Sequence, residues 1–107
     1  MRPILIEDAA DPRLDPYRNI RDRDHRREDR FLVEGAMPLR RAVEASRFPL
    51  ISVLLSESRF AALSPLLKDA PGDAPTFVAP QAVMDAVAGF AIHRGVLALA
   101  RRTPPPP

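Results

Sequence analysis

Apolar and polar positions alternate in blocks along the chain, and the blocks predict strands and helices in turn. Four short apolar runs are typical of buried strands, at residues 31–35, 49–55, 76–79 and 95–102. The run at 49–55 shows no alternation of apolar and polar residues, as expected of a strand that is covered on both faces. The segments between these runs carry apolar residues at helical spacing instead.

The first helix between strands is predicted over residues 36–46, where apolar and charged side chains separate onto two faces. Its apolar face, which we expect to cover the sheet, consists of Leu39, Ala42 and Val43. Its outward face consists of Arg40, Arg41 and Glu44.

A second helix is predicted to follow the run at 49–55, with Ser56 or Ser58 as its cap. Pro65 fits poorly in the middle of a helix, because proline lacks an N–H group and its ring meets the preceding turn. We therefore expect a helix in two parts, the second of which begins with Ser64 as cap and Pro65 as first residue. The inward side chains are Phe60, Leu63 and Leu67.

A third helix is predicted over residues 81–89, because Pro80 opens it and Gly89 stands where a C-terminal glycine belongs. Its apolar face consists of Val83, Met84 and Val87. Four strands that alternate with three helices imply right-handed crossover connections. We therefore expect an α/β fold, a three-layer α/β/α sandwich of about four largely parallel strands with crossover helices.

The composition is that of one small globular domain. The chain has 107 residues, of which 46% are hydrophobic, and it contains no cysteine, so disulfides and thiolate metal sites are excluded. A cysteine-free chain suits a reducing cytoplasm. No apolar run approaches the roughly 20 residues that span a bilayer. We therefore expect a cytoplasmic protein with no membrane partner.

The segment before the first strand is dense in charge without being net basic. Asp15 as N-cap and Pro16 as first residue predict a short helix through residues 17–23. Residues 1–30 hold eight arginines and eight carboxylates. The arginines that we predict to bind phosphates are Arg18, Arg21, Arg26 and Arg27, extended by Arg40 and Arg41. The alternative is ordinary ion pairing with Asp22, Asp24, Glu28 and Asp29.

Three stretches occur in a recognisable order: DPRLDPYRNIRDRDHRRED, then FLVEG at the first strand, then IHRGVLALA at the last. Together they resemble the N-terminal substrate-binding domain of the SpoU or TrmH family of RNA ribose methyltransferases. The resemblance covers roughly residues 11–102. In that family a strand ends in Glu-Gly, here Glu34 and Gly35, and the domain ends in His-X-Gly-Val-X-Ala, which His93 to Ala98 match.

The resemblance implies a fold like that of ribosomal protein L30e and a division of labour between two domains. Residues 1–102 would be the RNA substrate-binding domain, and the proline-rich residues 103–107 would be a linker towards a catalytic domain that is absent from this chain. In the family that second, knotted domain binds S-adenosylmethionine and dimerises. We therefore expect no cofactor in this chain, a monomeric fragment, a homodimeric parent protein, and structured ribosomal or transfer RNA as partner.

The candidate site residues have two interpretations each. His93 and Arg94 are predicted either to contact RNA or to shape the loop before the last strand. Glu34, Gly35 and Gly95 are predicted as a structural motif, in which Gly95 takes a positive φ or permits close backbone approach and Glu34 caps the following helix.

Three functions follow in order of support. The first is the non-catalytic RNA-recognition domain of a ribose 2′-O-methyltransferase that acts on ribosomal or transfer RNA. The second is a free-standing structural RNA binder of the kink-turn type. The third, an enzyme in its own right, would pair His93 with Glu34 or Asp85, but the sequence has neither a glycine-rich phosphate loop nor a paired-histidine metal spacing.

Overall fold

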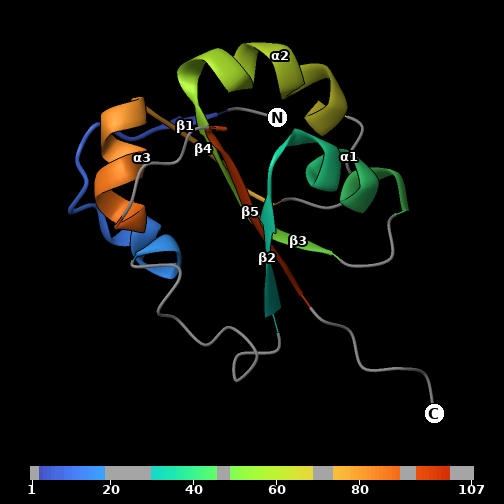
Figure 1. Ribbon diagram of the computed structural model, residues 1–107, viewed down its shortest axis with the longest axis horizontal. Coiled ribbons are helices and arrows are strands. Elements are labelled where there is room, and N and C mark those ends of the chain that lie inside the picture. The colour runs from blue at the N-terminus through green and yellow to red at the C-terminus, as the bar shows by residue number, and fades with distance from the viewer. Residues whose placement is uncertain (1–2, 19–29, 46–48, 69–73, 90–93, 102–107) are drawn as a thin grey trace.

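The computed structural model describes residues 3–18, 30–45, 49–68, 74–89 and 94–101, which form one sheet with helices on both faces (Figure 1). The elements in chain order are β1 (Ile4–Leu5), the 3-10 helix η1 (Pro12–Tyr17), β2 (Arg30–Glu34), α1 (Ala36–Ala45), β3 (Leu50–Ser56), α2 (Glu57–Lys68), β4 (Thr76–Ala79), α3 (Gln81–Ala88) and β5 (Val96–Arg101).

The sheet is mixed, with the strand order β1-β4-β3-β5-β2. β4 runs parallel to both of its neighbours, β1 and β3, whereas β5 runs antiparallel to both β3 and β2. The predicted α/β class is confirmed. Two details differ from the expectation: the sheet has a fifth strand, β1, and its largely parallel part is confined to β1, β4 and β3. The direction of β5 could not be read from its apolar run, because a buried strand has the same composition in either direction.

Helices cover both faces of the sheet, which confirms the three-layer arrangement (Figure 1). Successive residues of a strand point to opposite faces, so β3 and β5 contribute to two separate cores. Leu54, Leu97 and Leu99 pack with η1 and α3 on one face. Val53, Leu55 and Ala98 pack with α1 and α2 on the other. This double covering explains why β3 and β5 lack polar alternation.

The N-terminal segment differs most from the prediction. Of the helix predicted to begin at Asp15, residues 19–23 lie outside the described residues. Where the chain is described, residues 12–17 form the 3-10 helix η1, and Asp11 caps it by accepting a hydrogen bond of 2.9 Å from the Arg13 N–H. The helix thus begins with the earlier Asp-Pro pair of the sequence: Asp11 is its cap and Pro12 lies in its first turn, whereas Pro16 lies inside the helix. Because Leu14 and Tyr17 are buried against the sheet, burial selects this register.

Helix α2 is continuous through Pro65, so the expected two-part helix is wrong. The proline is exposed, and the backbone hydrogen bond that it omits lies on the solvent side. On the opposite side Leu63 and Leu67, one turn apart, are both buried. Burial of this pair favours one continuous helix over two separate parts. The predicted cap at Ser56 is present, since its Oγ accepts from the Arg59 N–H at 3.4 Å.

The other helices follow the sequence pattern. In α1, Leu39 and Val43 are buried while Arg40, Arg41 and Glu44 are exposed, as predicted. α3 ends at Gly89, whose φ of 85° is the left-handed conformation expected of a C-terminal glycine.

Candidate nucleic-acid interface

The start of β5 is the point where the two predicted motifs meet. Strands β2 and β3 flank β5 and run opposite to it, so the carboxyl ends of both lie beside its first residue. The Gly35 N–H donates to the Val96 carbonyl oxygen at 3.0 Å, and the Ser56 N–H donates to the Gly95 carbonyl oxygen at 2.9 Å. These bonds place residues 34–35 and 94–95, distant in sequence, at one corner of the sheet.

Gly95 holds this corner together because no larger residue fits. Its φ is +63°, and a Cβ atom at this position would lie 2.6 Å from the Ser56 Oγ. Backbone conformation and close approach both favour glycine here, as expected for a structural role of Gly95.

The side chain of Arg94 packs over the backbone of Gly35. Its φ is +104°, and a Cβ atom on Gly35 would lie 3.1 Å from the Arg94 Nη1 and 3.6 Å from the Arg94 Cδ. The arginine side chain therefore crosses directly over the glycine, next to the first turn of α1, where Pro38 is also in contact range of that position. A side chain at residue 35 would displace the Arg94 guanidinium.

Arg59 contacts the same loop from the other side. This residue lies in the first turn of α2, and its Nε–H donates to the backbone carbonyl oxygen of Arg94 at 3.0 Å. The contact joins α2 to the loop before β5 across 35 positions of sequence. It brings a second guanidinium group to the corner.

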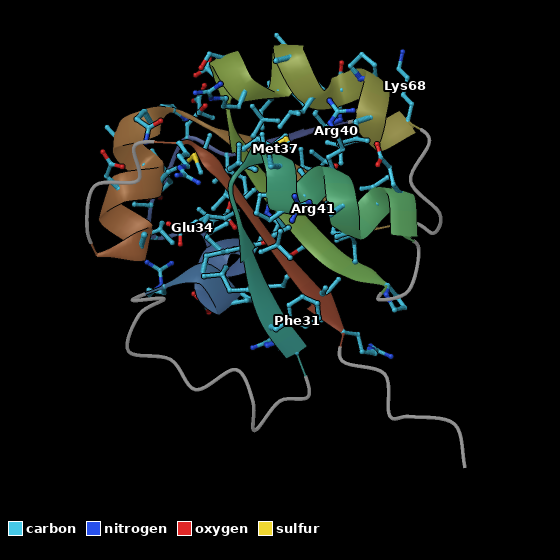
Figure 2. The ribbon with its side chains drawn as sticks, turned by 45° about the vertical axis from the view of Figure 1, so that its right-hand side comes forward. Phe31, Glu34, Met37, Arg40, Arg41 and Lys68 are labelled. Atoms are coloured by element: carbon cyan, nitrogen blue, oxygen red, sulfur yellow. The ribbon has the colours of Figure 1, made fainter. Side chains whose placement is uncertain are left out.

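Helix α1 adds basic side chains to the adjoining surface. Arg40 and Arg41 lie on its outer side, with Met37 near its start (Figure 2). Arg41 follows Pro38 by three residues, which places it on the same side of the helix, about one turn or 5 Å further along the axis. Met37 is 61% exposed. We call Arg41, Arg59 and Arg94 the basic corner.

The three arginines of the basic corner have no carboxylate partners among the described residues, a feature that they share with Lys68 and Arg101. Arg13 is bonded to Asp11 at 2.6 Å, and this contact lowers the pKa of Asp11 to about 2. Arg18 pairs with Asp15 at 3.2 Å, and Arg40 lies 3.8 Å from Glu44. Among residues 3–18, 30–45, 49–68, 74–89 and 94–101, no salt bridge engages Arg41, Arg59 or Arg94. Their guanidinium groups are available to an anionic ligand.

Two carboxylates at the same end of the sheet lie on the side of β1 and β4. Glu7 and Glu57 line a small pocket of about 80 Å³ together with Leu5, Ile6, Val78 and Pro80. Glu57 and Arg59 are two residues apart and so point to different sides of α2. This end of the sheet therefore carries Glu7 and Glu57 on the side of β1, and the basic corner together with the exposed Glu34 on the side of β5.

The predicted arginine surface is only partly brought together. Arg18 lies at the end of η1, on the opposite face of the sheet from Arg40 and Arg41 on α1, so these three do not form one patch. Arg21, Arg26, Arg27 and His93 lie outside the described residues. Of the arginines predicted to contact RNA, Arg94 lies at this corner, and Arg41 lies on helix α1, which begins there.

Two other predictions gain no support. The Glu34 carboxylate is exposed and, within the described part of the chain, accepts no hydrogen bond from α1, so it does not act as the predicted helix cap. Asp85, the alternative partner for His93, accepts a hydrogen bond from the Gln81 Nε2 at 3.0 Å. The described ranges contain no group of carboxylate, histidine or cysteine side chains that could hold a metal ion.

Sequence reasoning missed Arg59. The sequence pattern predicts only that this residue lies in the second helix, and nothing in the spacing signals that its side chain reaches a loop 35 positions away. Its place in the first turn after Ser56 was the one available signal, because that turn begins at the carboxyl end of a buried strand. In α/β sheets ligands bind at this end.

The chain is related to RNA methyltransferases in sequence and in fold. No family model matches it. A tRNA/rRNA methyltransferase of Mycobacterium bovis is 38% identical, in an alignment that covers 92% of this chain and 35% of that protein. A tRNA/rRNA methyltransferase of Mycobacterium tuberculosis is 36% identical with the same coverage. The chain thus spans about a third of the length of these curated relatives.

Two solved structures share the fold. An RNA 2′-O ribose methyltransferase superposes with a TM-score of 0.63 at 27% identity. The match covers 94% of this chain and 38% of the chain of that methyltransferase. An rRNA methyltransferase from Sinorhizobium meliloti superposes with a TM-score of 0.68 over 99% of this chain and 39% of its own, and at 11% identity this likeness shows the fold alone. The resemblance to RNA ribose methyltransferases predicted from the sequence is confirmed.

Proposed function

We propose that this chain is the RNA-recognition domain of an S-adenosylmethionine-dependent RNA 2′-O-ribose methyltransferase that acts on ribosomal or transfer RNA. The observation that carries the proposal is the basic corner: Arg94 crosses Gly35, Arg59 contacts the Arg94 backbone, Arg41 lies on the adjoining helix α1, and none of the three has a carboxylate partner in the described structure. Relatives named tRNA/rRNA methyltransferases, about three times as long as this chain, favour this function over a free-standing structural RNA binder.

The basic corner would bind RNA through its phosphates. Guanidinium groups form a planar fork that matches phosphate oxygens, and such contacts fix the register of an RNA without reading its bases. The aromatic side chains of the described residues belong to the core instead of the surface that would face RNA. Tyr17 and Phe77 are buried, and Phe31 and Phe60 pack against the core. Recognition would therefore depend on RNA shape and backbone rather than on base stacking.

Glu7 and Glu57, at the same end of the sheet beside β1 and β4, would limit where the RNA lies. Glu7 and Glu57 repel phosphates, so an RNA strand at the basic corner is directed along α1 rather than across β4 and β1.

Methyl transfer itself would take place in a second domain that holds the cofactor, with this domain positioning the substrate. We propose dimerisation through that second domain and a cytoplasmic location on the same basis of resemblance. No helix among the described residues has the length and apolar character needed to cross a membrane.

RNA binding by the isolated chain tests the proposal. Anisotropy titrations with unfractionated transfer RNA and with ribosomal RNA should show binding that weakens as salt rises. Arg94→Met and Arg41→Met should each lower the slope of log affinity against log salt by about 0.7–0.9, the value for one phosphate contact. Arg101→Met, at the opposite end of β5, removes the same charge away from the corner and serves as the control. Equal losses for all three variants would contradict a site at the corner.

A further inference from the structure

The backbone at Arg94 lacks the sheet partners that its neighbours have. The carbonyl oxygen of Gly95 accepts from the Ser56 N–H, and that of Val96 accepts from the Gly35 N–H. The positive φ of Gly95 turns the chain out of the strand just before these residues, so the Arg94 carbonyl oxygen leaves the ladder. Its hydrogen bond comes instead from the Arg59 Nε, at 3.0 Å.

We propose that Arg59 is a positioning residue for RNA binding, which holds the backbone of Arg94 so that the Arg94 guanidinium lies across Gly35 and faces a phosphate. This proposal rests on the proposed function, because it assigns a role at the same corner. Arg59 is not one of the residues that the sequence motifs identify, and its contact is to backbone rather than to the Arg94 side chain.

The geometry explains why an arginine is suited to this role. The Nε–H of a guanidinium group points sideways from the chain, in a fixed direction relative to the two terminal nitrogens. Arg59 can therefore donate through Nε to the Arg94 carbonyl while its terminal N–H groups stay available. A lysine ammonium has no fixed donor direction and would hold the carbonyl less firmly.

The energetic effect is one of preorganisation. An arginine on an unrestrained loop loses its conformational freedom when it binds a ligand, whereas one already fixed has less to lose. Arg94 is restrained on two sides: Gly35 leaves room for its guanidinium, and Arg59 fixes its backbone. Loss of the second restraint should weaken RNA binding by about two- to tenfold, the cost of ordering one long side chain.

A double-mutant cycle separates positioning from direct charge attraction. Arg59→Met should weaken binding of unfractionated transfer or ribosomal RNA by about two- to tenfold in the otherwise unchanged chain. In an Arg94→Met background the same substitution should cost clearly less affinity, because only the charge of Arg59 is then lost and there is no longer an Arg94 guanidinium to position. Arg101→Met again controls for net charge. An Arg59→Met loss of equal size in both backgrounds would overturn the positioning role, as would no loss in either.

Arg59→Lys distinguishes geometry from charge. If Arg59 positions the loop, the lysine variant should bind RNA measurably more weakly than the unchanged chain, although it keeps the positive charge. A lysine variant that binds RNA as tightly as the unchanged chain would overturn the proposal. Thermal unfolding of each variant checks that the fold is retained.

The loop can also be observed without RNA. In Arg59→Met the amide resonance of Gly95 should shift and its hydrogen exchange should become faster, while amides of β2 stay unchanged. An unchanged Gly95 amide would overturn the positioning role even if RNA binding fell. If the unchanged chain bound no RNA, the proposed function would fail by itself, and the amide measurement would still decide whether Arg59 orders the loop.

Discussion

The hydroxyl groups of Tyr17 and Ser52 lie 2.6 Å apart in the core, where η1 meets the central strand β3. Tyr17 is fully buried and Ser52 is 6% exposed. This hydrogen bond satisfies a polar pair inside one face of the sheet and ties the N-terminal segment to it.

Removal of both partners of this pair should cost little more than removal of one. Tyr17→Phe leaves the Ser52 hydroxyl buried without its partner, and we expect a loss of about 1–3 kcal/mol in the free energy of unfolding. Ser52→Ala in the Tyr17→Phe background should cost little more. Urea denaturation of the two single variants and the double variant measures the coupling, and additive losses would show that the hydrogen bond contributes nothing.

Burial of Tyr17 also predicts a loss of stability at alkaline pH. Burial raises the pKa of Tyr17 above its ordinary value, against a smaller opposing effect of the Ser52 hydrogen bond. A raised folded-state pKa gives a stabilising contribution that is complete below the unfolded pKa of about 10 and is lost as pH rises above it. The urea concentration at the unfolding midpoint should therefore decrease as the pH is raised from about 10 to 11. Because Tyr17 is the only tyrosine, tyrosinate absorbance should appear together with unfolding. A similar fall in Tyr17→Phe would assign the effect to another group.

Substitution of Gly95 should destabilise the fold more than substitution of Gly89. Both glycines have a positive φ, so alanine at either position carries about 1–3 kcal/mol of backbone strain. At Gly95 the added Cβ would also meet the Ser56 Oγ at 2.6 Å. Gly95→Ala should therefore lower the unfolding free energy further than Gly89→Ala does, as measured by urea denaturation. Ser56→Ala in the Gly95→Ala background should recover part of the difference. Equal losses at the two glycines would contradict the importance of the close contact.

The chain by itself should not bind S-adenosylmethionine. An adenosyl cofactor needs a concave pocket with converging polar groups, and the pocket of about 80 Å³ beside β1 is lined by Glu7 and Glu57 and by apolar side chains. Calorimetric titration of the chain with the cofactor should give no saturable heat. Micromolar binding would show that this domain holds the cofactor and would overturn its role as a recognition domain.

The chain should be monomeric in solution at tens of micromolar concentration. Among the described residues the large apolar side chains that are exposed are Leu5, at 70%, and Met37, at 61%. They lie on β1 and α1, at different edges of the sheet, and so do not form one apolar patch of the size that marks an interface. Light scattering measures the mass directly, and a stable dimer would contradict this expectation.

The sequence by itself determined the α/β class, the buried faces of α1 and α3, and the glycine at the end of α3. These features depend on local rules: the period of apolar positions decides between helix and strand, and a left-handed residue favours glycine. The motif around Gly95 was also readable, because its two constraints, φ and close approach, both restrict the residue type. The resemblance to RNA ribose methyltransferases rested on the same short motifs.

Only the tertiary structure decided the strand order, the direction of β5 and the composition of the basic corner. Strand direction leaves no mark on a buried run, and the pairing of Ile4–Leu5 with β4 is too short to show as a pattern. Burial of Leu63 and Leu67 outweighed the local preference of Pro65 against a continuous helix. Arg59 and Arg94 meet because β3 and β5 are neighbours, and a contact between residues 35 positions apart depends on that adjacency rather than on either residue's own neighbours in sequence.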